Sequence, residues 1–175
     1  MQLSFQEWES RSSLSAHFEK SKHSILMLGE KCEAPRRFYS LLIDHSDPFE
    51  IGILSSDLGS KPAAFASTEE HVLFIGHDQS IAVLDLAHKI IINQIPLDGV
   101  FFAFVADQRN TIVIHELGAV SLNIQGGVRW AVSADIVKRF YLERERLVFH
   151  FHDSEKVREI DLKTGNEIDL LTPPI

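Results

Sequence analysis

A repeat with a period of 38 residues is the sequence feature that most limits what this chain can fold into. Three segments align without gaps at that offset: His71–Leu86, Arg109–Ile124 and Leu147–Leu162. Several positions are apolar in all three segments, among them Ile75, Val113 and Phe151, then Leu84, Leu122 and Ile160, and then Leu86, Ile124 and Leu162. A constant period of this length indicates supersecondary units that bury their apolar faces on one another.

Each repeat also carries a polar residue directly before an expected turn. Asp85, Asn123 and Asp161 align at these positions. Short Asx side chains accept hydrogen bonds from backbone N–H groups two or three residues further on, which stabilises a turn. The pattern therefore predicts a strand that ends at each of these residues.

Short apolar runs lie before and after each aligned segment. They are Ala63–Ala66, Phe101–Val105 and Lys138–Leu142 before, and Ile90–Ile95, Val128–Val132 and Glu167–Leu171 after. Runs of this length that are rich in β-branched and aromatic residues are typical of strands. Roughly four short strands per repeat is the content of one blade of a β-propeller.

A family resemblance follows from the turn sequences. Val157–Ile168, with its Asp-x-x-Thr-Gly turn, resembles the repeats of quinoprotein-type bacterial propellers, and Ile81–Pro96 is similar to the surface-layer type. The resemblance covers about residues 63 to 171 and is structural. Thr-Gly is complete only at Thr164-Gly165, and no tryptophan follows Gly165 at the usual place. No residue matches a cofactor-binding position of those enzymes, so we expect no cofactor.

A fourth, weaker copy precedes the others, because Tyr39–Leu54 aligns with His71–Leu86 at an offset of 32 residues. We therefore predict an all-β fold of four antiparallel repeat units, which form a small or incomplete β-propeller-like architecture. The predicted organisation is a single domain, 1–175, divided into an irregular closing or capping segment (1–36), a degenerate first repeat (37–62) and three better repeats (63–100, 101–137 and 138–175). Within the first segment, Ser24–Leu28 is a predicted strand that ends at Gly29.

Two alternatives to a closed propeller stay open. One is an incomplete propeller that is completed by homodimerisation, and the other is a curved antiparallel meander. A local alternative concerns Ala134–Arg146, whose apolar residues also fit an amphipathic helix. The repeat alignment favours a strand over Lys138–Leu142 instead.

Charge and length narrow the functional classes. The chain has 175 residues and a formal net charge of −8, which disfavours binding to nucleic-acid phosphates. The charge is compatible with a basic protein partner, or with solubility alone. Cys32 is the single cysteine, no apolar run is long enough to span a membrane, and no signal peptide is recognisable. We therefore expect a cytoplasmic location and no membrane contact.

Histidines are the candidate ligand residues. His45, His77 and His115 share one repeat position, and in the last unit His152 stands beside the equivalent Asp153. Because equivalent positions of radially arranged blades lie on one rim, these four histidines form a candidate metal site. In the other, favoured interpretation, each residue ends a strand and bonds the backbone of the following turn.

Catalytic templates are absent from the sequence: it contains no Gly-x-Ser-x-Gly elbow, His-Glu-x-x-His helix or Walker-type loop. We predict a non-catalytic protein-interaction module with an unidentified partner, which is basic if the module resembles acidic immunity proteins. The opposing hypothesis is a metal- or small-molecule-dependent enzyme with its site on the histidine-bearing rim.

Overall fold

The computed structural model describes residues 1–30, 32–56, 59–67, 71–107, 110–153 and 155–168. In these residues the chain forms four β-sheets and a short helix, α1 (Arg11–Lys20). The first sheet contains, in spatial order, β1 (Gln2–Trp8), β3 (Arg37–Asp44), β4 (Phe49–Ser55) and β2 (Ser24–Leu28). The second contains β5 (Ala63–Ser67), β6 (Val72–His77), β7 (Ser80–Asp85) and β8 (Ile90–Pro96).

The two later sheets follow the same plan. The third contains β9 (Phe101–Asp107), β10 (Asn110–His115), β11 (Gly118–Leu122) and β12 (Val128–Ser133), and the fourth contains β13 (Val137–Glu143), β14 (Arg146–Phe151) and β15 (Val157–Asp161). In the second, third and fourth sheets each strand pairs antiparallel with the next along the chain. The predicted all-β, propeller-like repeat architecture is confirmed.

The turns that the repeat predicts are present in atomic detail. Oδ1 of Asp85, of Asn123 and of Asp161 each accepts hydrogen bonds from backbone N–H groups two to four residues further on, at 2.8–3.1 Å. The strands β7, β11 and β15 end at or next to these residues in the same way. The predicted Asx turns are therefore confirmed.

The first sheet is built differently from the other three. The N-terminal segment supplies two of its strands, β1 and β2, on either side of the β3–β4 hairpin. β2 confirms the predicted strand Ser24–Leu28, and it pairs parallel with β4. The segment 1–36 thus contributes two strands to the first sheet, and its helix covers the same sheet.

The first sheet also runs in the opposite direction to the second. Its β3–β4 hairpin lies beside the β7–β8 turn, because Nζ of Lys89 is 2.5 Å from Oδ2 of Asp47. The end of β4 lies beside the β6–β7 turn, where Ser55 donates to Asp78 at 2.6 Å. The alignment of Tyr39–Leu54 with His71–Leu86 therefore pairs residues that are not equivalent in the structure, and this predicted equivalence is wrong. An alternating apolar pattern is the same for a strand read in either direction, so the sequence pattern did not reveal the reversal.

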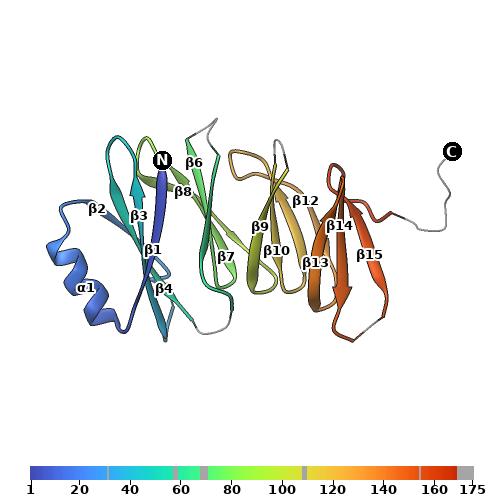
Figure 1. Cartoon of the computed structure of the whole chain (residues 1–175), viewed down its shortest axis with the longest axis horizontal. Coiled ribbons are helices and arrows are strands. Elements are labelled where there is room, and N and C mark those ends of the chain that lie inside the picture. The colour runs from blue at the N-terminus through green and yellow to red at the C-terminus, as the bar shows by residue number, and fades with distance from the viewer. Residues whose placement is uncertain (31, 57–58, 68–70, 108–109, 154, 169–175) are drawn as a thin grey trace.

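Three apolar layers join the four sheets into a row (Figure 1). Alternate residues of each inner strand face opposite layers. The fully buried members include Leu41, Ile51 and Leu84 in the first layer, Phe74, Val113 and Leu122 in the second, and Ile112, Leu147 and Phe149 in the third. Each such side chain contributes about 1.5–3 kcal/mol through burial, so the layers account for most of the stability of the row.

The segment for which a helix was the alternative is a strand. β13 covers Val137–Glu143 and pairs antiparallel with β14. Val137 is buried in the third layer, whereas Tyr141 and Leu142 are about half exposed. The strand prediction for Lys138–Leu142 is confirmed.

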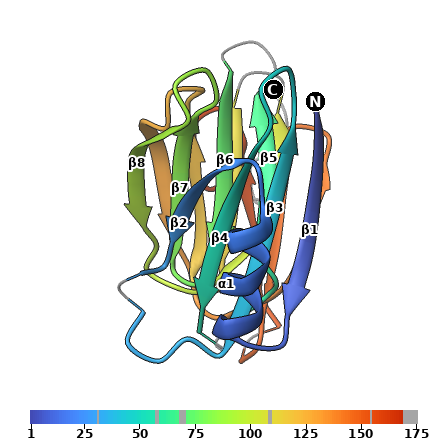
Figure 2. The same cartoon turned by 90° about the vertical axis from the view of Figure 1, so that its left-hand side faces the viewer.

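The row is open and each of its ends is covered differently. Figures 1 and 2 show α1 against the outer face of the first sheet, while the fourth sheet lies at the far end. On the outer face of the fourth sheet, an ion pair of Arg146 with Glu159 at 2.8 Å flanks Val148, which is 1% exposed. Within the described residues the ring is therefore not closed by contact of the first sheet with the fourth.

Candidate functional site

Helix α1 fits closely on the first sheet. Ser10 begins the helix with a capping box, in which its hydroxyl accepts from the Ser13 N–H at 3.1 Å and Ser13 accepts from the Ser10 N–H. Leu14 is 2% exposed beneath the helix. At Gly52 of β4, an added Cβ would meet Phe18 at 2.8 Å and Met27 at 2.4 Å. The glycine therefore leaves the space into which the helix side chains pack.

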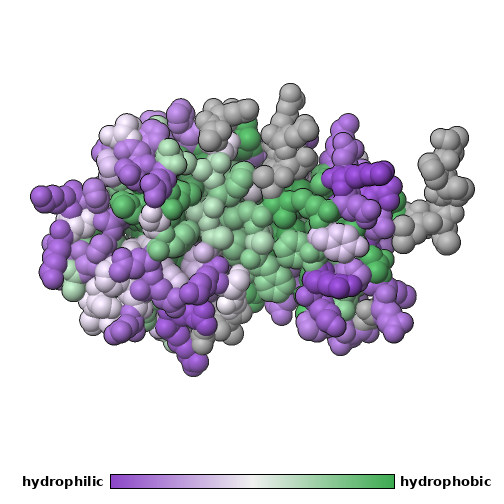
Figure 3. Space-filling model, in the orientation of Figure 1, coloured by the Kyte–Doolittle hydropathy of each residue, from purple (hydrophilic) through white to green (hydrophobic). Residues whose placement is uncertain are grey.

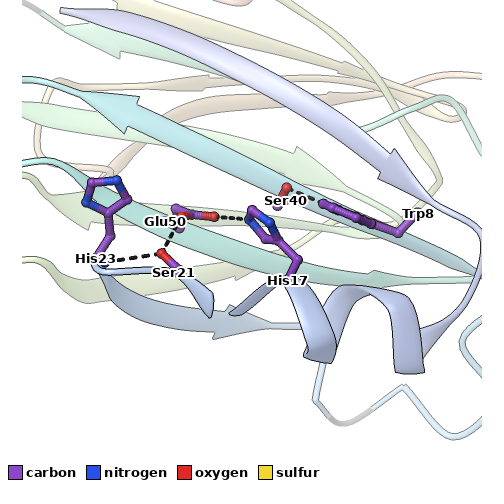
Figure 4. Close-up of polar contacts among 6 residues, drawn as sticks. All are labelled: Trp8, His17, Ser21, His23, Ser40 and Glu50. Carbon is purple, nitrogen blue, oxygen red and sulfur yellow. Dashed lines mark hydrogen bonds and ion pairs between the residues drawn. The ribbon is translucent and has the colours of Figure 1, made fainter. Parts of the chain in front are cut away.

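A half-buried polar cluster fastens α1 to β4 (Figure 4). Glu50 is 4% exposed in β4, where it interrupts the apolar run Phe49–Leu54. Its carboxylate lies 2.5 Å from Nε2 of His17 and accepts from the Ser21 hydroxyl at 2.6 Å. Next to it, the Trp8 indole N–H donates to Ser40 at 3.0 Å, and its ring lies 4.6 Å from the imidazole of His17.

The cluster holds a charge rather than a catalytic nucleophile. Burial raises the pKa of Glu50, but the hydrogen bonds from Ser21 and His17 outweigh burial, so the pKa lies below its ordinary value of 4.5. In a nucleophile–base pair the serine hydroxyl bonds the imidazole, whereas here both groups bond the carboxylate. We interpret the cluster as the polar contact that holds α1 on the first sheet.

Replacing Glu50 with glutamine should lower the free energy of unfolding by about 2 kcal/mol at pH 7, because His17 and Ser21 lose a charged acceptor. Since the folded-state pKa of Glu50 is lowered, the charge stabilises the fold fully above pH 4.5 and loses this effect as the pH falls through the folded pKa. Urea unfolding of both proteins between neutral and acid pH measures this difference. The difference in free energy of unfolding between the two proteins should shrink only at acid pH. A constant difference at all pH values would contradict this role of Glu50.

None of the residues of this cluster is among the site residues predicted from the sequence. The available signal was one glutamate inside the apolar run Phe49–Leu54, which predicts a buried carboxylate that needs partners. The partners His17 and Ser21 lie 33 and 29 residues away along the chain. No local pattern connects residues that only the docking of α1 brings together.

A second feature is the face formed by the first strand of each sheet, β1, β5, β9 and β13. Hydrophobic side chains gather across the middle of this face (Figure 3). β5 pairs with β6 alone and β9 with β10 alone, so each leaves one edge without a partner strand in the described residues. We name the edge window by its half-buried apolar residues: Ala63, Ala64, Phe65, Ala66, Phe102, Ala103, Phe104 and Val105.

Charges flank the edge window but do not enter it. At one side Glu7 of β1 pairs with Lys61 at 2.7 Å, and at the other side Lys138 and Arg139 of β13 are exposed. Segments 63–67 and 101–105 contain no charged residue. Proteins usually protect unpaired strand edges with charges or proline, and exposed apolar patches mark interaction sites. The edge window is therefore the part of this face suited to contact with another chain.

The sequence-predicted histidines do not share one rim. His77 and His115 end β6 and β10, and backbone hydrogen bonds from Phe101 to Asp78 and from Glu116 to Val100 join these turns at one strand end of the sheets. His152 follows β14 at the same end and is exposed. His45 lies in the β3–β4 hairpin at the opposite end, because the first sheet is reversed. The prediction of a common rim is wrong for His45.

Burial controls the chemistry of the two inner histidines. His77 and His115 are 5% and 2% exposed, and burial lowers the pKa of both imidazoles against the opposing effect of nearby carboxylates. Burial therefore favours the neutral form of both rings. The Ser80 hydroxyl lies 3.2 Å from Nε2 of His77, and the Leu117 N–H donates to Nδ1 of His115 at 3.4 Å. These contacts agree with the turn-stabilising interpretation.

No group of three or more His, Cys, Asp or Glu side chains is placed to hold a metal ion together, as far as the described residues extend. Metal binding by His45, His77, His115 or His152 stays a prediction, which the metal content of the purified protein tests. Cys32 is a half-buried free thiol. In the part of the chain that the structure describes, no helix has the length and hydropathy needed to cross a membrane.

Comparisons with known proteins identify the fold. No protein-family model and no curated protein matches the chain. Among solved structures, BamB from Moraxella catarrhalis matches with a TM-score of 0.52 at 13% identity, over 85% of this chain and 48% of BamB. The dihydro-haem d1 dehydrogenase NirN matches with a TM-score of 0.53 at 11% identity, over 76% of this chain and 34% of NirN. Both are propeller proteins, and this chain spans less than half of each.

Proposed function

We propose that this chain is a non-catalytic protein-interaction module that binds a protein partner on the edge window. The observation that carries the proposal is the contrast along one face, where two unpaired, uncharged strand edges lie between charged ones. A partly exposed apolar surface of this kind gains free energy when a partner covers it. The apolar layers behind it hold β5 and β9 in a fixed arrangement, which limits the ordering cost of binding.

The net charge of −8 favours a basic partner, as in acidic immunity proteins. The same charge disfavours nucleic acid, and we place the module in the cytoplasm. Long-range attraction between the two proteins would raise the association rate and would be screened by salt. A complex with a basic partner should therefore form more slowly as the salt concentration rises, while a salt-independent rate would contradict this part of the proposal.

A charge placed in the edge window should weaken binding strongly. Ala103→Lys adds a cation at a half-buried position of β9 that lies outside the three apolar layers. The matched control, Ile92→Lys, adds the same charge to the outer strand β8 at a side chain that is 45% exposed. Affinity capture with each full-length variant, followed by mass spectrometry, compares the proteins retained. We expect Ala103→Lys to retain at least about tenfold less partner than the wild type.

Ile92→Lys should retain the partner, and thermal unfolding should show that both variants stay folded. Equal capture by the wild type and Ala103→Lys would overturn the proposed site. Light scattering of the purified wild type shows in addition whether the bound chain is a second copy of this protein, since a homodimer would have twice the mass of 19.8 kDa.

A further inference from the structure

A hollow lies between the first and second sheets, at the end of their strands where the reversed β3–β4 hairpin meets the turns of the second sheet. Its volume is about 200 Å³. Ile43, Phe49 and Leu86 give it an apolar floor, and His45, His71 and Lys89 stand around it. It is separate from the edge window and from the Glu50 cluster, and the proposed function does not use it.

Lys89 occupies a backbone position that favours glycine. Its φ is 54°, in the left-handed region, and the residue two repeat periods later, Gly165, has a φ of 75°. The turn of the third sheet uses Gly126, with a φ of 80°. A lysine at such a position costs free energy that glycine would avoid, and its side chain makes contacts that a glycine could not make.

The ammonium group of Lys89 is held beside the hollow. Nζ lies 2.5 Å from Oδ2 of Asp47 and 5.7 Å from the centre of the Phe49 ring. The side chain of Lys89 is 21% exposed, whereas that of Asp47 is 80% exposed. The Lys89 side chain is thus mostly covered, with its ammonium group near the Phe49 ring, while its present partner reaches in from the solvent.

Two imidazoles add hydrogen-bonding groups to the same hollow. His45 is exposed, and its Nδ1 lies 2.8 Å from the Ser46 hydroxyl. His71 has a φ of 54°, and its backbone carbonyl is fixed by the N–H of Leu86 at 2.8 Å. Lys89 and the two histidines can all donate hydrogen bonds to an anion, and Asp47 is the acidic side chain among the residues that line the hollow.

We propose that this hollow binds a small organic anion, a carboxylate attached to an apolar group. The apolar body would rest on Ile43, Phe49 and Leu86, and the carboxylate would take the place of Asp47 beside Lys89. Few polar groups above an apolar floor are the usual composition of a small-molecule site, and charge-assisted hydrogen bonds to a carboxylate are the stronger kind.

Benzoate is a suitable probe, and two-dimensional 1H–15N NMR of the full chain is the measurement. Benzoate should shift the resonances of the β3–β4 hairpin and the β7–β8 turn. Benzamide, which has the same shape without the charge, and acetate, which lacks the apolar body, should each bind about tenfold more weakly. Inorganic phosphate tests whether charge alone is sufficient, and binding as tight as that of benzoate would overturn the assignment of an apolar anion.

Variants at the ion pair make the test specific. Lys89→Gln should weaken benzoate binding about tenfold, whereas Asp47→Asn should strengthen it, because the lysine loses its competing partner. His88→Gln, in the same turn but paired with Asp85 at 2.7 Å, is the matched control and should leave binding unchanged. Shifts that map elsewhere, or Asp47→Asn binding more weakly than the wild type, would overturn the proposal.

Discussion

Replacing Phe74 with alanine is expected to lower the free energy of unfolding by about 3–5 kcal/mol. Phe74 is 0% exposed on β6, in the apolar layer between the second and third sheets. Truncation would leave a cavity in the middle of the row, where the sheets on both sides limit relaxation. Because a domain of this size is typically stable by about 5–15 kcal/mol, the variant would lose a large share of the total.

Urea unfolding followed by circular dichroism measures the loss for Phe74→Ala. The control is Ile90→Ala on β8, where the side chain is 50% exposed and the change should stay within about 0.5 kcal/mol. A loss below about 1 kcal/mol for Phe74→Ala, or equal losses for both variants, would mean that the second and third sheets do not pack on this side chain.

Replacing Gly29 with alanine is expected to lower the free energy of unfolding by about 3 kcal/mol. Gly29 follows β2 with a φ of 75°, a conformation that strains any residue with a Cβ. An added Cβ would lie 2.0 Å from the carbonyl oxygen of Leu54, at the end of β4. Because backbone cannot turn aside as a side chain does, β2 and β4 would have to separate at this end.

Thermal and urea unfolding of Gly29→Ala measure this effect, and Glu30→Ala at the exposed neighbouring position is the control. The control should change the free energy of unfolding by less than about 0.5 kcal/mol. If Gly29→Ala were as stable as the wild type, the parallel pairing of β2 with β4 at Leu28 and Ile53 would be contradicted.

The three meander sheets could be predicted from the sequence because their information is local. Asp85 and Asp161 bond their own turns, and Leu84, Leu122 and Ile160 fill the same place in the three successive layers. The first sheet could not be predicted in this way. Its apolar alternation gives no direction, and its two edge positions are filled by β1 and β2, which α1 separates along the chain. Direction depends on tertiary contacts such as Ser55 with Asp78.

The candidate sites were less accessible to sequence reasoning than the fold. The apolar runs Ala63–Ala66 and Phe101–Val105 were predicted as strands, but the sequence does not state which strands lie at a sheet edge. The equal spacing of the histidines indicated one rim, and the reversal of the first sheet moves His45 away from it. The neighbours of His45 in the structure, His71 and Lys89, come from two different turns, so only the stacking of the sheets brings them together.

Amide hydrogen exchange of the full chain, alone and with the captured partner, tests the role of the edge window most directly. In the free protein, the backbone N–H groups on the unpaired edges of β5 and β9 should exchange faster than those that pair with β6 and β10. On binding, exchange should slow at residues 63–67 and 101–105, while the outer strands β8 and β12 should be unchanged. Protection of β8 and β12 with no change at β5 and β9 would contradict the account.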